Sequence, residues 1–376
     1  MNSIFTIKID PKRIFGLDIL RAAAILFVVI GHGSYLLPPK LGKMTDYLVF
    51  DGVSIFFVLS GFLIGGILIK IINENGLSRR ILLDFWARRW FRTLPNYFLI
   101  LILLCLLNFV FTDGFALKSV YSYFIFSQNL FYPHPDFFAE AWSLSIEEWF
   151  YLIVPLLIAT ITFTLKTAYK KSILITSILL IVLVTFFRYY RYSTIEIATL
   201  SQWDTLFRKQ VLMRLDSLMF GVIAAYVSFH HYQFWSKYRK SFFALGLFLF
   251  LISKIAIDRF SEINLLYATV FHFTLISIAT FLLLPYLSEL KTGRGILYKS
   301  ITYVSLTSYS MYLLNLSIIQ FWIINQIPWA NFIKNPILMI LSKYGLYWIL
   351  VISLSILLYK YFEIPMTALR DRKKKS

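Results

Sequence analysis

Residues 15–33 read FGLDILRAAAILFVVIGHG, an apolar run that contains Asp18, Arg21 and His32. A helix rises about 1.5 Å per residue, so about 20 apolar residues span the hydrocarbon core of a bilayer. A charge inside such a span costs several kcal/mol unless it is paired or hydrated, and it marks a functional site by default. The stretch therefore predicts a transmembrane helix that carries functional polar groups.

The composition of the whole chain extends this prediction. Of the 376 residues, 59% are hydrophobic and 15% are charged, and the mean hydropathy is +0.72. A soluble domain carries about 25% charged residues. Backbone polar groups in lipid must be satisfied within the chain, which favours helices. We therefore expect an all-α integral membrane protein. No small-residue cleavage site follows the first apolar stretch, so we expect a retained helix and not a signal peptide.

About ten stretches are long and apolar enough to be transmembrane helices. The connection at 113–148 is the weakest point, because its apolar piece from Val120 to Phe131 is too short to span and is expected to be re-entrant or interfacial. We expect one transmembrane domain at 1–369, with no internal repeat, and a basic tail at 370–376. The predicted spans are 17–37, 47–72, 94–112, 149–165, 172–189, 211–229, 241–257, 265–287, 303–327 and 339–361.

The basic residues predict the orientation. Lys and Arg are enriched in cytoplasmic connections. With the N-terminus inside, 22 of them fall in inside segments, including Lys8, Lys12 and Arg13, and 8 fall outside, including Arg259. Ten spans then place both termini in the cytoplasm. The net charge of +18 would suggest a nucleic-acid partner for a soluble protein. Here the charges lie in short loops between apolar spans, so we expect no such partner.

The polar residues of the first span fall on one side of a helix. Eleven residues separate Arg21 from His32, which turns a helix by roughly 1,100° and places both side chains on one face, about 16 Å apart along the axis. Asp18 lies near the same face, and Gly31 and Gly33 would let another helix or a substrate approach His32. The alternative is an interfacial Asp18–Arg21 pair with an unrelated histidine.

The second span, beginning DGVSIFFVLSGFLIGG at Asp51, contains a packing motif. Gly61 and Gly65 have the spacing of small residues at close helix contacts, so we expect a neighbouring helix against them. Asp51 itself is compatible with a place in the outer headgroup region.

The connection after this span reads RRILLDFWARRWFRTLP at 79–95. Arg88 and Arg89 lie four and three residues before Arg92, so these side chains can form one guanidinium face, which suits phosphate oxygens. The alternative is an ordinary cytoplasmic loop that binds lipid headgroups.

Two adjacent carboxylates, Glu147 and Glu148, lie in AWSLSIEEWFYLIVP at 141–155. A carboxylate bonded to His32 would fix its tautomer and raise its basicity, as a general base requires. Alternatively the pair does no more than interact with a helix N-terminus. In the sixth span Arg214 and Asp216 are two residues apart, so each should find a partner on another helix or in a polar cavity.

The remaining polar residues suggest no cofactor. Glu363 and Lys254 lie near helix ends, where they could extend to the interface. His230, His231 and His272 lack the spacing of a metal cluster, and Cys105 is the single cysteine, so we expect no metal site and no disulfide.

Taken together, several segments resemble the acyltransferase-3 family of bacterial membrane-bound O-acyltransferases. They occur in the family's order and cover nearly the whole chain. Two positions depart from the family pattern: Asn315 stands where histidine is usual, and Trp149 stands where glutamine is often found. The matching segments are FGLDILRAAAILFVVIGHG, GVSIFFVLSGFLI, RRWFRTLPNY, WSLSIEEWFYLIVP, RLDSLMFGVIAA, SYSMYLLN and FEIP.

The resemblance implies a ten-helix enzyme of the bacterial cytoplasmic membrane. It would transfer an acyl group, often acetyl, from cytoplasmic acyl-CoA to a hydroxyl of an envelope or exported glycan. Some members carry an appended extracellular hydrolase-like domain; the 376 residues suggest none, so we expect the chain to act alone or with a separate partner.

The expected site has three parts. His32 would be a base or transient acyl carrier, with Arg21, Glu147 and Glu148 as the other catalytic residues. Arg88, Arg89 and Arg92 would bind the phosphates of the donor, with no permanently bound cofactor. The other polar positions expected to contact substrate or support the site are Asp18, Asp51, Ser60, Arg214, Asp216, Tyr309, Ser310 and Asn315.

Two other classes of protein compete with this interpretation. A transporter or flippase could use intramembrane Asp, Arg and His residues as a proton or substrate path, although the sequence lacks the repeats with broken helices that transporters often show. A non-catalytic scaffold would leave the intramembrane charges unexplained. Binding of acetyl-CoA separates the enzyme from the transporter.

Overall fold

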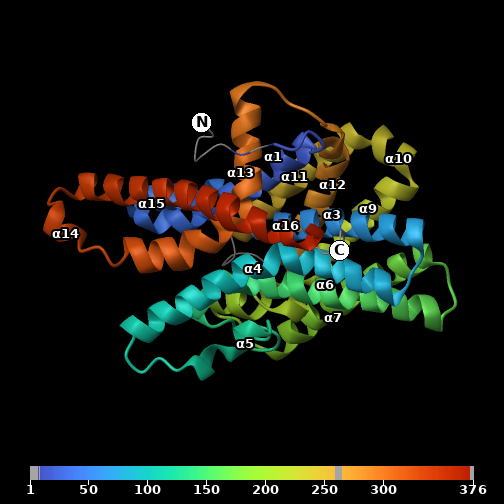
Figure 1. Cartoon of the computed structure of the whole chain (residues 1–376), viewed down its shortest axis with the longest axis horizontal. Coiled ribbons are helices and arrows are strands. Elements are labelled where there is room, and N and C mark those ends of the chain that lie inside the picture. The colour runs from blue at the N-terminus through green and yellow to red at the C-terminus, as the bar shows by residue number, and fades with distance from the viewer. Residues whose placement is uncertain (1–6, 8, 259–264, 373–376) are drawn as a thin grey trace.

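The computed structural model describes residue 7 and residues 9–258 and 265–372, and all the regular elements within these ranges are helices (Figure 1). The prediction of an all-α membrane protein is confirmed. Eight helical segments of the described residues are long and apolar enough to cross a membrane: Phe15–Leu36, Pro39–Asn75, Arg79–Phe111, Ala141–Thr164, Tyr169–Thr194, Arg239–Ile257, Tyr267–Glu289 and Pro336–Leu369.

Each of the ten predicted spans coincides with a helix. Two of them fall outside the set of eight: α9 is shorter, and α13 is less apolar but continues into a π-helical segment, η7. The long helices are α1 (Phe15–Gly33), α3 (Gly52–Asn75), α4 (Arg79–Phe111), α6 (Ala141–Thr164), α7 (Tyr169–Thr194), α9 (Leu215–His230), α11 (Arg239–Asp258), α12 (His272–Glu289), α13 (Gly295–Leu314), η7 (Asn315–Ile324) and α15 (Pro336–Leu358).

Short elements connect the long helices. The connection at 113–140 contains short helical segments and no helix long enough to span, as its short apolar piece predicted; its re-entrant or interfacial position remains a prediction. The short elements are η1 (Ser34–Leu36), α2 (Pro39–Leu48), η2 (Leu117–Val120), α5 (Tyr121–Phe124), η3 (Asp136–Phe138), α8 (Leu200–Trp203), η4 (Asp204–Arg208), η5 (Val211–Met213), α10 (Tyr232–Lys237), η6 (Tyr267–Phe271), α14 (Trp329–Phe332), η8 (Tyr359–Glu363) and α16 (Ile364–Arg372).

The starts of two helices, α4 and α6, differ from the prediction, and both differences involve segments with charged residues. Helix α4 starts at Arg79, capped by Ser78, and not at residue 94. Helix α6 starts at Ala141, so Glu147 and Glu148 lie in its second turn and not at its start. The predicted boundaries followed the loss of hydropathy, but an α-helix satisfies its own backbone hydrogen bonds and can continue through charged residues beyond the apolar stretch, as α4 does through Arg79 and Arg80. The expected guanidinium face on 88–92 is therefore on a helix.

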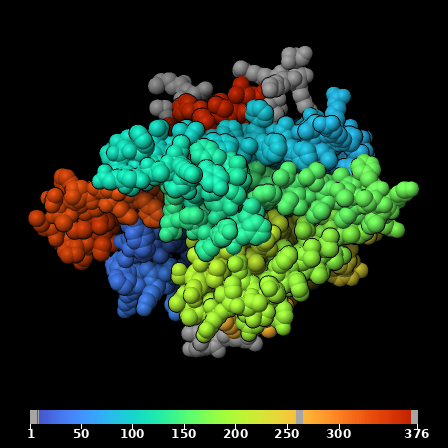
Figure 2. All heavy atoms as spheres, turned by 90° about the horizontal axis from the view of Figure 1, so that it is seen from below, coloured from blue at the N-terminus to red at the C-terminus, as the bar shows by residue number. Residues whose placement is uncertain are grey.

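The connections pack on the helix ends. On the face shown in Figure 2, the connection between α4 and α6 lies beside the one between α7 and α9. The side-chain amide of Asn129 joins them by donating to the backbone oxygen of Lys209 (2.6 Å) and of Trp142 (3.0 Å). These contacts hold the first turn of α6 in place.

The cytoplasmic location of the termini remains a prediction. Lys8, Arg259 and residues 373–376 lie outside the described residues.

The predicted glycine contact is confirmed: α3 packs against α9. A Cβ atom on Gly61 would lie 2.0 Å from the backbone oxygen of Leu218, and one on Gly65 would lie 3.1 Å from Cα of Val222. On α9, a Cβ on Gly221 would lie 2.1 Å from the backbone oxygen of Val58. The helices touch backbone to backbone, which brings the polar residues at the start of α3 next to those of α9.

Replacing Gly61 with alanine should separate the two helices. We expect G61A to destabilise the protein by about 1–3 kcal/mol, because the new methyl group meets rigid backbone. G66A is the matched control on the same helix, where an added Cβ meets nothing within 4 Å. Thermal unfolding in detergent should show a lower midpoint for G61A alone. Equal midpoints for the two variants would contradict the contact.

Candidate active site

A cavity of about 380 Å³ lies between α1, α3, α4, α6 and α13. Five cationic side chains line it but only two carboxylates, Asp18 and Glu147, so its charge is positive. Hydroxyl groups also line it, among them those of Ser60, Thr93 and Ser143. The cationic residues are Lys12, Arg13, Arg21, Arg89 and Arg92.

The two adjacent glutamates have different surroundings. Glu147 lines the cavity and accepts hydrogen bonds from Ser60 on α3 (2.7 Å) and from Tyr151 one turn further along α6 (3.2 Å). Glu148 points towards α4, where Thr93 donates to it (2.7 Å). The expectation that either carboxylate orients His32 is wrong for this structure, because their hydrogen bonds go to these hydroxyl groups and the imidazole bonds elsewhere.

Asp18 does not pair with Arg21. Its carboxylate forms a bidentate ion pair with Arg13 and accepts a hydrogen bond from Ser305 on α13 (2.7 Å). The interpretation of an Asp18–Arg21 pair is therefore wrong. Arg21 lines the cavity with Arg92, while Asp18 neutralises Arg13 at the start of the same helix.

His32 lies at the other end of α1 and is half-buried. Its Nδ1 is 2.6 Å from Oδ1 of Asn315, the first residue of η7. The Asn315 amide nitrogen donates to the backbone oxygens of Met311 (2.9 Å) and Tyr312 (2.7 Å). This leaves the amide oxygen as an acceptor, so His32 Nδ1 carries the proton and Nε2 keeps the free lone pair.

Arg21 and His32 both lie within the uninterrupted helix α1, so their spacing places the two side chains on one face of it. This agrees with the one-face arrangement expected from the sequence. Arg21 lines the cavity together with Ser308, Tyr309 and Tyr312, and His32 contacts Asn315. His32 is not among the residues that line the cavity, so the site has two separate centres along α1.

The polar residues of the last helices are also internal. Tyr309 lines the cavity and donates to the backbone oxygen of Thr93 (2.7 Å). Ser310 (2.9 Å) and Asn96 (3.0 Å) both donate to Glu363, which is 8% exposed. The expectation that Glu363 extends to the interface is wrong: it is held inside the protein by two helices.

The three arginines expected to bind the donor phosphates do not all reach the cavity. Arg89 and Arg92 line it, and Arg88 does not.

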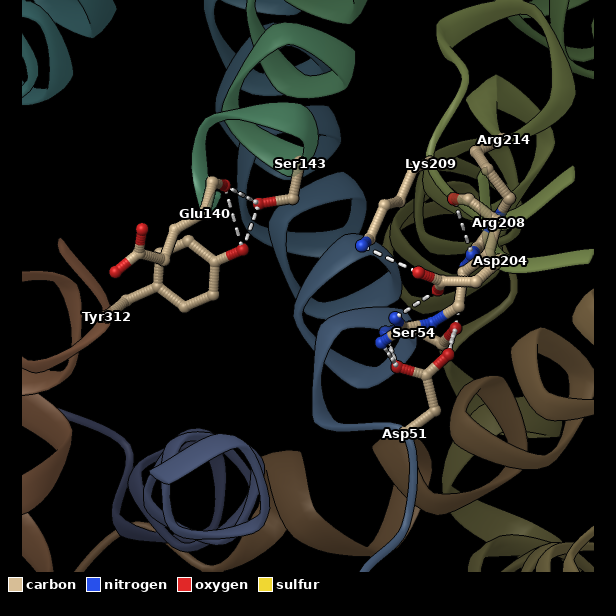
Figure 3. Close-up of polar contacts among 9 residues, drawn as sticks. All are labelled: Asp51, Ser54, Glu140, Ser143, Asp204, Arg208, Lys209, Arg214 and Tyr312. Atoms are coloured by element: carbon tan, nitrogen blue, oxygen red, sulfur yellow. Dashed lines mark hydrogen bonds and ion pairs between the residues drawn. The ribbon is translucent and has the colours of Figure 1, made fainter. Parts of the chain in front are cut away.

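A second polar group surrounds the start of α3 (Figure 3). Asp51 caps α3, accepts from Ser54 Oγ (2.7 Å) and forms an ion pair with Arg208 (3.3 Å). Arg208 also pairs with Asp204 (2.9 Å). Burial by itself would raise the pKa of Asp204, but Arg208 and Lys209 outweigh it and hold this pKa below its usual value. Asp51 is therefore part of an internal charge network and not a headgroup contact.

Arg214 and Asp216 each find a partner on another helix, as their spacing predicted. Arg214 donates to Ser54 on α3 (2.6 Å), and its guanidinium lies over the rings of Phe57 and Phe273. Asp216 pairs with Arg188 of α7 (2.7 Å), and both side chains are fully buried. Arg188, near the end of the predicted span 172–189, was not singled out from the sequence.

Sequence reasoning also missed several lining residues. Tyr151 lies four residues after Glu147, on the same helix face, which is a signal that the motif could have provided. Lys12 and Arg13 were counted only as positive-inside charges. Their place in the cavity depends on how the segment before α1 packs, which no local pattern encodes.

The fold and site define a multi-helix membrane protein with a cationic internal cavity. A family model described as an acyltransferase domain matches residues 14–360, and the chain belongs to this acyltransferase-3 family. The interpretations as a transporter and as a scaffold are therefore set aside.

Similar proteins carry O-acetyltransferase names. The chain is 27% identical over 398 aligned positions to a provisionally named O-acetyltransferase of Staphylococcus aureus (strain COL), covering 96% of this chain and 58% of that protein. It is 31% identical over 179 residues to the O-acetyltransferase OatA of Staphylococcus aureus (strain NCTC 8325 / PS 47), covering 44% of this chain and 27% of that protein. The chain thus spans less than two thirds of the length of these relatives. No solved structure matches it.

The buried pair of Arg188 and Asp216 should be sensitive to the loss of one partner. D216A leaves a buried guanidinium without its counter-charge, which we expect to cost about 3–5 kcal/mol. The double variant R188M/D216L, which removes both charges, should recover most of this loss. Thermal unfolding in detergent measures both.

The exposed pair of Lys70 and Glu74 on α3 is the control, with side chains 67% and 57% exposed. E74A should leave the unfolding midpoint unchanged, because exposed ion pairs contribute little. A double variant no more stable than D216A would show that the pair is not the cause of the loss.

Proposed function

We propose that the chain transfers an acyl group, most simply acetyl, from acyl-CoA to a hydroxyl group of an envelope or exported glycan at a bacterial cytoplasmic membrane. The observation that carries this proposal is the cavity with five cationic and two acidic side chains at one end of α1 and a histidine with a fixed tautomer at the other end. Coenzyme A offers several phosphate oxygens, and arginine side chains match them well. Membership of the family supports the reaction class.

The donor would enter from the basic end. Arg89 and Arg92 lie on one face of α4 and line the cavity with Arg21. We assign the phosphates to these three side chains. The rise from Arg21 to His32 is about 16 Å along a helix. Arg21 is therefore too far from the imidazole to act on the same carbonyl, and we assign it to donor binding and not to catalysis.

The transfer itself would take place beside His32. Nε2 accepts the proton of the acceptor hydroxyl while the hydroxyl oxygen attacks the thioester carbonyl. The carbon–oxygen bond forms, the carbon–sulfur bond breaks, and the coenzyme A thiolate leaves with the proton that the imidazole returns. Asn315 takes the place of an orienting carboxylate by holding Nδ1–H. Glu147, bonded to Ser60 and Tyr151, is assigned to shaping the donor cavity.

Variants at the two ends of α1 should affect different steps: donor binding at the basic end and turnover at the histidine end. We expect R89A and R92A each to raise the Kd for acetyl-CoA by about 10- to 100-fold, the value of a charge-assisted hydrogen bond. H32Q should keep the wild-type Kd and lower turnover by about 10²- to 10⁴-fold, because it removes a general base. Calorimetry and transfer of a radiolabelled acetyl group measure the two effects.

Lys240 is the matched control for the arginines, since it is a basic, exposed residue at the start of α11. K240A should change neither binding nor turnover. Wild-type transfer by H32Q would exclude the histidine mechanism, and the absence of acetyl-CoA binding in the wild type would overturn the proposed donor. Mass spectrometry of envelope glycans from a deletion strain would identify the acceptor.

A further inference from the structure

Glu140 is a buried carboxylate that the mechanism above does not use. It immediately precedes α6 and is 1% exposed. Its Oε1 accepts from the backbone N–H groups of Leu316 (3.1 Å) and Ser317 (2.8 Å), and its Oε2 accepts from the Ser317 hydroxyl. All three donors belong to the first turn of η7. A carboxylate with this burial and three donors holds that turn in one position.

The hydrogen bonds to Glu140 are needed because the helix type changes at Asn315. In an α-helix, the Leu316 N–H would donate to the backbone oxygen of Tyr312. Here the side-chain amide of Asn315 donates to that oxygen (2.7 Å), and the Leu316 N–H donates to Glu140. Backbone N–H groups released at such a bulge must be satisfied elsewhere. Glu140 supplies the acceptor, and this releases the Tyr312 oxygen for the amide of Asn315.

The consequence reaches His32. With its nitrogen bound to two backbone oxygens, the Asn315 amide can present only its oxygen to Nδ1 of His32 (2.6 Å). Glu140 also meets the cavity wall on its other side. Its backbone oxygen accepts from the Tyr312 hydroxyl (3.1 Å), which is bonded in turn to Ser143 (2.7 Å), as Figure 3 shows.

We propose that Glu140 is a positioning residue for the transfer reaction: by clamping the first turn of η7 it orients the Asn315 amide, which fixes His32 as the Nδ1–H tautomer with Nε2 free. This inference rests on the proposed function, in which Nε2 is the base. It assigns to the connection before α6 a role in the chemistry at α1.

The tautomer of His32 can be measured directly, without an activity assay. Nitrogen-15 NMR of histidine-labelled protein in detergent distinguishes a protonated from an unprotonated ring nitrogen, and H32Q identifies the His32 signals among the five histidines. In the wild type we expect a protonated Nδ1 and an unprotonated Nε2. E140Q keeps an acceptor oxygen for the two N–H groups and should preserve this pattern. E140A and N315A should give a mixture of tautomers.

Kinetics provide the second readout. E140A should lower turnover about 10- to 100-fold with an unchanged Kd for acetyl-CoA, whereas E140Q should restore most of the rate. E140D, which keeps the charge but is one methylene shorter, is the second variant if E140A fails to fold, and it should fall between the two. T280V is the control: Thr280 is fully buried and donates to the backbone oxygen of Ile276, so its loss should leave the His32 signals unchanged.

The two proposals fail in different ways. A folded E140A protein, or a folded E140D protein where E140A does not fold, with wild-type His32 signals and turnover would overturn the clamp. Wild-type transfer by H32Q would overturn the histidine mechanism, yet the NMR pattern of E140A would still decide whether Glu140 orients the imidazole. A mixture of tautomers already present in the wild type would also contradict the clamp.

Discussion

The structure depends on one constraint: a polar group inside an apolar helix bundle must find its partner within the protein. Arg188 and Asp216 meet this constraint as an ion pair, and Asp18 meets it through Arg13 and Ser305. Because lipid offers no hydrogen bonds, each such residue fixes the rotation and depth of its helix. The polar residues therefore determine how the helices are assembled, although they are a small part of the composition.

The close contact of α3 with α9 shows how packing and charge depend on each other. Gly61 and Gly221 let the two backbones touch. The contact brings Ser54 within hydrogen-bond distance of Arg214, beside the ion pair of Asp51 with Arg208. A wider spacing would leave Arg214 without the Ser54 hydroxyl, so glycine at these positions supports the charge network as well as the packing.

The same constraint explains the irregular helix at the histidine. The change from α13 to η7 releases backbone N–H groups, and a carboxylate from a different part of the chain accepts them. A regular helix would satisfy its own backbone and would present Asn315 differently. Although asparagine replaces the usual histidine at position 315, a hydrogen bond to His32 is still made. The amide nitrogen of Asn315 is occupied, and its oxygen accepts from His32.

The sequence by itself determined the all-α class, the approximate positions of ten helices among the described residues, the packing face of Gly61 and the shared direction of Arg21 and His32. These follow from hydropathy, helical period and residue size, which are local. Only the tertiary structure decided the partners: Asn315 and not a glutamate for His32, Arg13 for Asp18, Asn96 and Ser310 for Glu363, and Glu140 for η7. A buried polar residue indicates that it needs a partner, but only packing decides which one. Most of these partners lie on segments distant in sequence, and Asp18 selects Arg13, five residues before it, over Arg21 on its own helix.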